Sequence, residues 1–321
     1  MKYRRLGSAG IKVSEIGLGS WLTIGHGIDA GASRACIRRA FERGVNFFDS
    51  ADVYAHGAAE ECLGGELRDF PRRDLVIATK CYFPMGDGVN NRGLSRKHVF
   101  ESIHDSLRRL RLDHLDLYQC HRFDPDVELI ELVRAMDDLI RQGKILYWGL
   151  SEWPAAKIRE VCALARQVNA CPPVSEQPEY SIAARRVETN GVQRACAECG
   201  VGMVVWSPLK QGILSGKYSG GKVPSGARAG DSKMNAFLPH VKRELADKVD
   251  QLRPIAQQRG MSPAQLAIAW LLGREALASV IVGASRVQQV DENIDACEFA
   301  TKLDANDLAA IDRVFPAAEY P

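Results

Sequence analysis

The chain has 321 residues, of which 46% are hydrophobic and 26% charged, and it carries a formal net charge of +2. This composition is typical of a globular protein with a large core. No block of five or six like charges occurs, so nothing favours binding to nucleic acid or to an acidic membrane surface. No apolar stretch reaches the roughly 20 residues that span a bilayer, and we expect no membrane insertion.

The N-terminus and the nine cysteines indicate a cytoplasmic protein. The basic start MKYRRLGSAG has no apolar signal segment behind it. The cysteines lack the dense spacing of a secreted disulfide framework, so we interpret them mainly as small buried side chains. Cys196 and Cys199 have a CxxC spacing, but the second pair that a zinc site needs is absent. We expect a pair on a helix, and no metal.

In chain order, residues 1–14 come first and alternate around a Ser-Ala-Gly turn, which predicts a β-hairpin that closes the floor of a barrel. Short β-type apolar runs then alternate with longer helical patterns. The predicted strands are EIGLG (15–19), NFFDS (46–50), LVIATK (75–80), LDLYQCH (115–121), ILYWGLS (145–151), VSEQPEY (174–180), GMVVWSPL (202–209) and SVIVGA (279–284).

Two of the intervening helices have clear signals. Residues 95–111 carry apolar side chains every three or four positions, which predicts an amphipathic helix. Ser262 and Gln265 have the spacing of a capping box at the start of another helix. Residues 210–240 are rich in Gly, Ser and Lys and predict a long loop after the seventh strand.

Strands that are apolar on both faces and separated by helices indicate a parallel sheet covered by helices. Eight such units favour the α/β fold known as the (β/α)₈ TIM barrel, here with an N-terminal hairpin and long loops on the C-terminal face. We expect residues 1–321 to form a single domain. Active sites of such barrels lie at the carboxyl ends of the strands. Those ends carry Asp49, Lys80, His121, Ser151, Gln177, Ser207 and Gly283, with Tyr54 on the loop after the second strand.

Four of these residues suit the protonation of a carbonyl oxygen. A phenol has a pKa of about 10 and donates its proton poorly at neutral pH unless a nearby cation stabilises the phenolate. Lys80 can supply that cation, and Asp49 can hold Lys80 by a charge-assisted hydrogen bond. His121 can direct the substrate oxygen toward the Tyr54 hydroxyl. The set therefore predicts general acid catalysis by Tyr54.

The sequence resembles an aldo-keto reductase over essentially its whole length. Within that superfamily it is similar to the branch of the voltage-gated potassium channel β subunits and their bacterial relatives. That branch typically has asparagine where this chain has His121. The resemblance is carried by DSADVYAHGAAEECLG (49–64), ATK (78–80), LDLYQCHRFD (115–124), GLSEW (149–153), EQPEYS (176–181), WSPLKQGILSGKY (206–218) and GASRVQQVDENI (283–294).

The resemblance implies a catalytic tetrad of Asp49, Tyr54, Lys80 and His121, and NADPH as the cofactor. Ser151 and Gln177 would bind the nicotinamide carboxamide and Trp206 would lie near its ring. The segment from Ser207 through Leu209 to Gly212, with Lys217 and Arg228, would wrap the pyrophosphate. The adenosine half would contact Gly283, Ser285, Arg286, Gln289, Glu292 and Asn293. Serine and arginine at a helix N-terminus favour the 2′-phosphate of NADPH over NADH.

Gly17 and Gly19 form a GxG pair without the third glycine and the acidic residue of a Rossmann fingerprint, so we reject that interpretation. Trp21, just beyond them, is expected to wall the pocket that holds cofactor and substrate. The leading hypothesis is NADPH-dependent reduction of an aldehyde or ketone. One alternative is a regulatory, redox-sensing subunit with slow turnover, and a weaker one is an aldolase with a Schiff base on Lys80. A homo-oligomer is compatible with the sequence.

Overall fold

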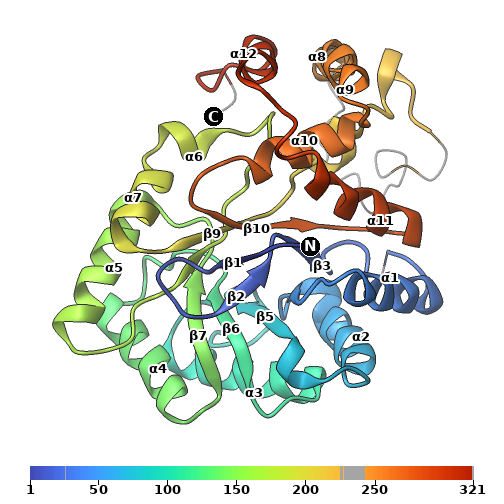
Figure 1. Ribbon diagram of the computed structural model, residues 1–321. Helices are drawn as coiled ribbons and strands as arrows, with labels where there is room; N and C mark the ends of the chain where they lie inside the picture. Colours follow the sequence, from blue (N-terminus) through green and yellow to red (C-terminus); the bar gives the residue numbers. More distant parts are fainter. Residues whose placement is uncertain (26, 225–226, 228–242, 320–321) are drawn as a thin grey trace.

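The computed structural model describes residues 1–25, 27–224, 227 and 243–319. Its centre is a closed barrel of parallel strands in which each strand pairs with the next along the chain, and the last pairs with the first. Figure 1 shows the helices arranged around this barrel. The strands are β3 (Ile16–Gly19), β4 (Phe47–Asp49), β5 (Val76–Cys81), β6 (Leu115–Cys120), β7 (Ile145–Leu150), β8 (Ser175–Glu176), β9 (Gly202–Val205) and β10 (Leu277–Val282).

The predicted (β/α)₈ barrel is therefore confirmed, with strands at all eight predicted places. Two strands, β8 and β9, are much shorter than predicted. The strand β8 stops before Gln177 because Pro178 has no backbone N–H to donate. The strand β9 stops before Trp206, and Ser207 then takes a left-handed backbone with φ 58°. Both departures occur at the carboxyl ends, where the chain leaves the barrel.

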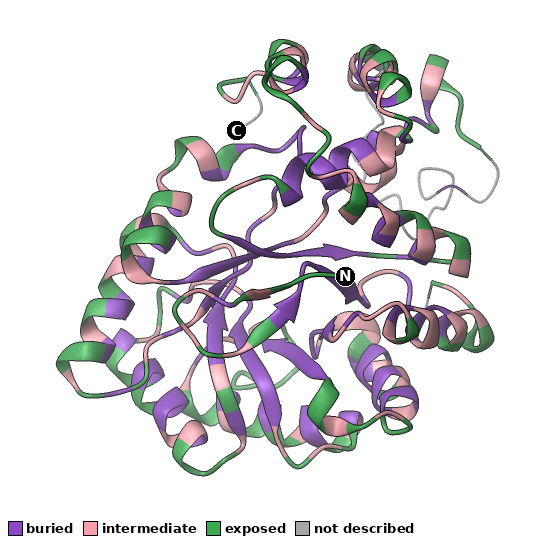
Figure 2. Ribbon diagram, viewed as in Figure 1, coloured by how far each residue is buried: buried purple, intermediate pink, exposed green. Residues whose placement is uncertain are grey.

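The helices cover the outside of the barrel, and their buried faces turn toward the strands, as Figure 2 shows. The 3₁₀ segments are η1 (Tyr54–Gly57), η2 (Arg72–Asp74), η3 (Lys210–Ser215), η4 (Ser219–Gly221) and η7 (Ala296–Glu298). The helices are α1 (Ala30–Glu42), α2 (Ala58–Leu67), α3 (Arg96–Leu110), α4 (Leu129–Arg141), α5 (Ala155–Gln167), α6 (Arg186–Thr189), α7 (Val192–Cys199), α8 (Arg243–Gln251), α9 (Arg253–Gln258), α10 (Pro263–Leu272), α11 (Val287–Asp295) and α12 (Ala305–Val314).

Both helices singled out from the sequence form. The helix α3 begins after Ser95, whose hydroxyl accepts the backbone N–H of His98, and its apolar face is buried. It ends at Arg111, which takes a left-handed backbone that cannot continue a helix. The helix α10 has the predicted capping box, in which the side chains of Ser262 and Gln265 each accept the other's backbone N–H.

The predicted N-terminal hairpin closes the amino end of the barrel. The strands β1 (Tyr3–Arg5) and β2 (Lys12–Ser14) pair antiparallel. Leu6 and Val13 are fully buried and pack in one cluster with inward-facing barrel residues such as Phe47 and Leu117. In Figure 1 the hairpin lies across the middle of the view, beside β10. The floor of the barrel is thus apolar and filled.

Two residues closer to the carboxyl ends of β4, β5 and β6, the side chains that point into the barrel become polar. Side chains that share a face of a strand are two residues apart, so Phe47 is followed on the inside by Asp49, Ala78 by Lys80, and Leu117 by Gln119. The polar residues of this layer are buried as deeply as the apolar ones below them. The apolar layer at the amino end of the barrel serves stability, and the polar layer at the carboxyl end supplies side chains that can take part in a reaction.

The segment predicted as a long loop, residues 210–240, begins with the short segments η3 and η4. Most of its remainder, including Arg228, lies outside the described residues. The helix α8 follows it, packs beside η4 and leads into α9. No helix within residues 1–25, 27–224 and 243–319 combines the length and apolar character needed to cross a bilayer.

Candidate active site

The four predicted catalytic side chains meet at the carboxyl end of the barrel. Lys80, at 0% exposure on β5, places its Nζ 2.6 Å from Asp49 Oδ2 and 3.4 Å from the Tyr54 hydroxyl. The Tyr54 and His121 rings stand edge to face with centroids 5.8 Å apart. Asp49 ends β4, His121 follows β6, and Tyr54 opens η1, so separate elements bring the cluster together.

Burial and charge set the protonation of this cluster. Burial raises the pKa of Tyr54 above its ordinary value, and the Lys80 ammonium offsets only part of that effect. Burial alone would lower the pKa of Lys80, but Asp49 and Tyr54 together raise it. The pKa of His121 falls well below its ordinary value because of burial and the charges of Lys80 and Arg122. At neutral pH the site therefore holds a protonated phenol, a charged ammonium and an uncharged imidazole.

A buried amide layer fixes Asp49 from its other side. Its Oδ1 accepts hydrogen bonds from Gln177 Nε2 at 3.0 Å and Gln119 Nε2 at 3.3 Å. The Ser151 hydroxyl donates to the carbonyl of Gln177 at 3.0 Å. Ser151 and Gln177 thus lie beside the cluster, where the nicotinamide carboxamide was expected. The sequence analysis missed Gln119, although it lies on β6 two residues before His121, a spacing that places both side chains on the inward face.

Aromatic rings form one wall above the cluster. The Trp21 ring lies 6.5 Å from the Tyr54 ring and 6.0 Å, edge to face, from the Trp206 ring. Phe83, another residue that the sequence analysis missed, stands edge to face with His121 at 4.9 Å. Trp21 is half-buried, as expected of a pocket wall that keeps one face accessible.

Glu152 anchors this wall. It follows Ser151 with a left-handed backbone, φ 58°, which is uncommon for a residue with a side chain. Its Oε1 accepts the Trp206 indole N–H at 2.9 Å and the Glu179 backbone N–H at 2.6 Å, and its Oε2 pairs with Arg186. The loop after β7 is thereby tied to the residue that follows β9.

The loop after β9 turns sharply. Ser207, Lys210, Gln211 and Gly212 all have positive φ, and the backbone N–H groups of the last three donate within the loop, to the Ser207 carbonyl, the Ser207 hydroxyl and the Leu209 carbonyl. Lys210 pairs with Glu179 at 2.8 Å. The side-chain oxygen of Gln211 is buried without a hydrogen-bond partner in the described structure. Leu209 precedes η3 and packs partly buried against the core.

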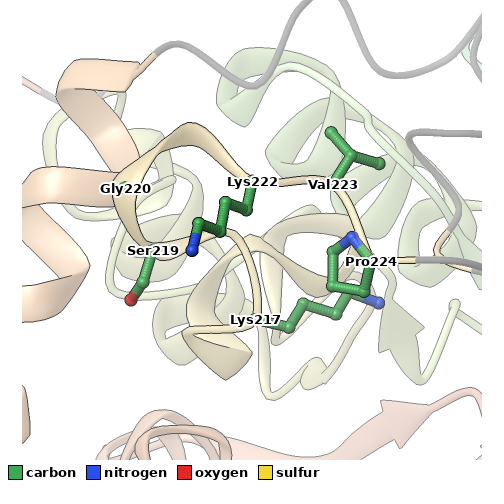
Figure 3. A pocket seen from close by; sticks show the side chains of 6 residues that line it. All are labelled: Lys217, Ser219, Gly220, Lys222, Val223 and Pro224. Atoms are coloured by element: carbon green, nitrogen blue, oxygen red, sulfur yellow. The ribbon is translucent and has the colours of Figure 1, made fainter.

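An open pocket of about 890 Å³ lies beside this loop. Lys217 and Lys222 contribute two ammonium groups to its lining, and Figure 3 shows the Lys222 side chain extending toward Ser219. None of the four catalytic candidates lines it. Two lysines around an open cavity suit an anionic group such as a pyrophosphate, at a distance from the reacting end.

The remaining predicted cofactor residues gather after β10. Ser285 donates through its N–H and its hydroxyl to Gln289 Oε1, at 2.8 and 3.1 Å. Arg286, the residue before α11, is exposed. Gly283 and Glu292 are also exposed and Asn293 is buried. Gly283, Ser285 and Arg286 thus lie at the N-terminus of α11, where an anion is favoured, and Gln289 in its first turn, whereas Glu292 and Asn293 lie in the C-terminal half of the helix.

These residues fit a phosphorylated dinucleotide. Within the described chain, the buried His121 Nδ1 and Gln211 Oε1 lack partners, one at the reacting end and one in the left-handed loop. Lys217, Lys222 and Arg286 supply positive charge. Ammonium and guanidinium groups suit the pyrophosphate and the further phosphate of such a cofactor, and the Gln211 amide oxygen can accept a hydrogen bond from it.

The CxxC pair lies on α7, with Cys196 buried and Cys199 partly exposed. It is therefore a pair on a helix, as predicted. Among the described residues, no group of three or more His, Cys, Asp or Glu side chains could hold a metal ion.

Comparison with known proteins adds an independent result. Residues 15–315 match the Aldo/keto reductase family. The chain is 38% identical over 320 residues to a "Probable voltage-gated potassium channel subunit beta" of Oryza sativa subsp. japonica, covering 98% of this chain and 96% of the relative. It is 40% identical over 318 residues to a protein of the same name from Arabidopsis thaliana, with the same coverage. A "Putative voltage-gated potassium channel subunit beta" of Schizosaccharomyces pombe is 39% identical over 320 residues, which is 97% of this chain and 92% of that protein.

Proposed function

The chain belongs to the aldo/keto reductase family, and on that premise we propose that it reduces an aldehyde or ketone to an alcohol with NADPH. The observation that carries the proposal is the position of Lys80 Nζ between Asp49 and the Tyr54 hydroxyl, beside His121. We further propose that residues 1–321 act as one domain in the cytoplasm. Arg286 and Ser285 at the start of α11 support NADPH over NADH.

Each residue of the cluster has a distinct part in this reaction. The bound cofactor would supply a hydride to the carbonyl carbon. Tyr54 holds the proton for the carbonyl oxygen, and its raised pKa keeps that proton in place at neutral pH. When the proton leaves, Lys80 stabilises the phenolate, and Asp49 keeps Lys80 oriented. His121, uncharged, directs the substrate oxygen without competing as an acid.

The replacement of Tyr54 by phenylalanine tests the proposal. We expect the rate of carbonyl-dependent NADPH oxidation to fall by about 10²–10⁴, because the general acid is lost, while NADPH still quenches the protein's fluorescence. Tyr3→Phe removes a hydroxyl at the opposite end of the barrel and serves as the control. Full turnover in Tyr54→Phe would contradict the mechanism. NADH measured in parallel tests the cofactor preference.

The names of the relatives favour a second candidate, a regulatory subunit that binds NADPH and turns over slowly. A steady-state rate far below the roughly 1–10³ s⁻¹ usual for enzymes, across a broad carbonyl panel, would support it. Complete oxidation of one equivalent of bound NADPH by the same carbonyl compounds would show that the chemistry itself is intact. His121, an uncharged imidazole beside Tyr54, favours the reductase.

A further inference from the structure

Arg122 stands at the rim of the cluster and has no part in the proposed mechanism. It follows His121 directly at the exit of β6, and its Nη1 donates to the His121 carbonyl. Its guanidinium carbon lies 5.4 Å from the centre of the Phe83 ring, whose edge meets His121 at 4.9 Å. Its charge contributes to the low pKa of His121. The guanidinium is therefore a near neighbour of the reacting end.

Among the described residues, no acidic side chain forms an ion pair with Arg122. Arginines that are partly buried usually have an acidic partner, but in the described part of the chain no carboxylate lies within ion-pair distance of Arg122. The acidic residues around the site have other partners, since Asp49 pairs with Lys80, Glu152 with Arg186 and Glu179 with Lys210.

The remaining acidic neighbour does not compensate Arg122 either. Glu176 is fully buried on β8, and burial raises its pKa to about 8, so it is mostly uncharged at neutral pH. Its Oε1 accepts the Trp153 backbone N–H at 3.1 Å and is thereby committed to the loop after β7. An unpaired guanidinium at a partly exposed position is available to a ligand.

The walls of the site fit the rest of such a ligand. The Trp21 ring neighbours that of Tyr54, and the Phe83 ring neighbours that of His121. Flat apolar rings favour an aromatic or short aliphatic spacer. A guanidinium presents parallel N–H donors that match both oxygens of a carboxylate. A guanidinium that can bind a carboxylate therefore lies next to the carbonyl-protonating cluster, with the Phe83 ring in contact with both Arg122 and His121.

We propose that the substrates of this site are carbonyl compounds that also carry a carboxylate, which Arg122 binds while the carbonyl oxygen lies at Tyr54 and His121. This inference rests on the proposed reductase function. No bond to the carboxylate forms or breaks. The hydride and proton are transferred as in the reaction above, and the product is a hydroxy acid.

Matched substrates test the inference. We expect kcat/KM for 4-formylbenzoate to exceed that for its methyl ester, because the ester keeps the ring and the aldehyde but loses the charge. Arg122→Gln should lower this ratio by about 10- to 100-fold, the usual effect of losing a hydrogen bond to a charged group, and Arg122→Lys should retain part of it. Arg68→Gln removes the same charge from the exposed end of α2, far along the helix from the rim, and should leave the ratio as in the wild type.

The outcomes separate the two proposals. If the protein reduces both substrates and the ratio is equal in wild type and Arg122→Gln, the carboxylate site is wrong and the reductase function stands. If the protein reduces no carbonyl compound, the reductase function is wrong. The carboxylate site at Arg122 is then tested by ligand binding alone. In that case 4-(hydroxymethyl)benzoate should quench the tryptophan fluorescence of the wild type at about tenfold lower concentration than that of Arg122→Gln. Equal binding would then reject the carboxylate site as well.

Discussion

Glu152 is the residue that connects the loop after β7 to the aromatic wall. Its carboxylate accepts the Trp206 indole N–H and the Glu179 backbone N–H, and also pairs with Arg186. An indole that donates to a fixed carboxylate has a restricted orientation. Glu152 touches none of the proposed reacting atoms, so we regard it as a positioning residue for Trp206.

We predict that Glu152→Ala weakens NADPH binding by roughly tenfold, the usual cost of losing a hydrogen bond to a charged group. The KM for NADPH should rise more than kcat falls, because Trp206 is predicted to contact the cofactor and not the proton donor. Glu152→Gln keeps an oxygen for the indole N–H and should restore most of the affinity. The Kd from fluorescence titration measures the effect, and equal Kd values in wild type and Glu152→Ala would refute the role.

The N-terminal hairpin is the element that closes the barrel, and its contribution is to stability. Leu6 is fully buried against Val13 and the apolar floor, at the end opposite to the catalytic cluster. The cavity left by a truncated core leucine is filled only partly by its neighbours. The cost of truncation should therefore appear in unfolding and not in catalysis.

We predict that Leu6→Ala lowers the free energy of unfolding by about 2–5 kcal/mol, measured by urea denaturation, and leaves kcat at room temperature close to wild type. Lys12→Ala, at an exposed position of the same hairpin, should change the stability by less than about 0.5 kcal/mol. A stability loss for Leu6→Ala as small as that of Lys12→Ala would show that the hairpin does not close the core.

For the whole molecule, buried Glu176 makes stability depend on pH. Burial disfavours the charged form and raises the pKa of Glu176 from the reference value of 4.5 to about 8 in the folded protein. Between these values the unfolded chain loses the proton and the folded chain keeps it. Stability therefore falls as pH rises from 4.5 toward 8, and the full cost is present above 8.

We predict that Glu176→Gln, a permanent mimic of the protonated acid, stabilises the protein by about 3 kcal/mol at pH 7 and by much less at pH 5. Thermal unfolding across this range should show a flatter pH dependence than that of the wild type. Glu61→Gln, at an exposed position of α2, is the matched control. A gain for Glu176→Gln that is the same at pH 5 and pH 8 would contradict the raised pKa.

The sequence by itself determined the eightfold alternation of strands and helices, the hairpin and the capping box, because each depends on local periodicity or on a few adjacent residues. It also predicted that Asp49, Lys80 and His121 would meet, since parallel strands bring them to one end of a barrel in any such fold; their catalytic roles stay a prediction. The resemblance of seven ordered motifs to one family supplied the cofactor residues, and the family itself is confirmed. Their individual roles stay predictions.

Only the tertiary structure decided which side chains share a contact. The pairing of Glu152 with Trp206, 54 residues apart, leaves no trace in either local pattern. The short β8 and the left-handed turn at Ser207 follow from how the chain leaves the barrel. The unpaired charge of Arg122 and the protonated Glu176 depend on which opposite charges fold within reach and on how much water is excluded. Local sequence encodes the elements, whereas burial and long-range contacts set the charges of the site.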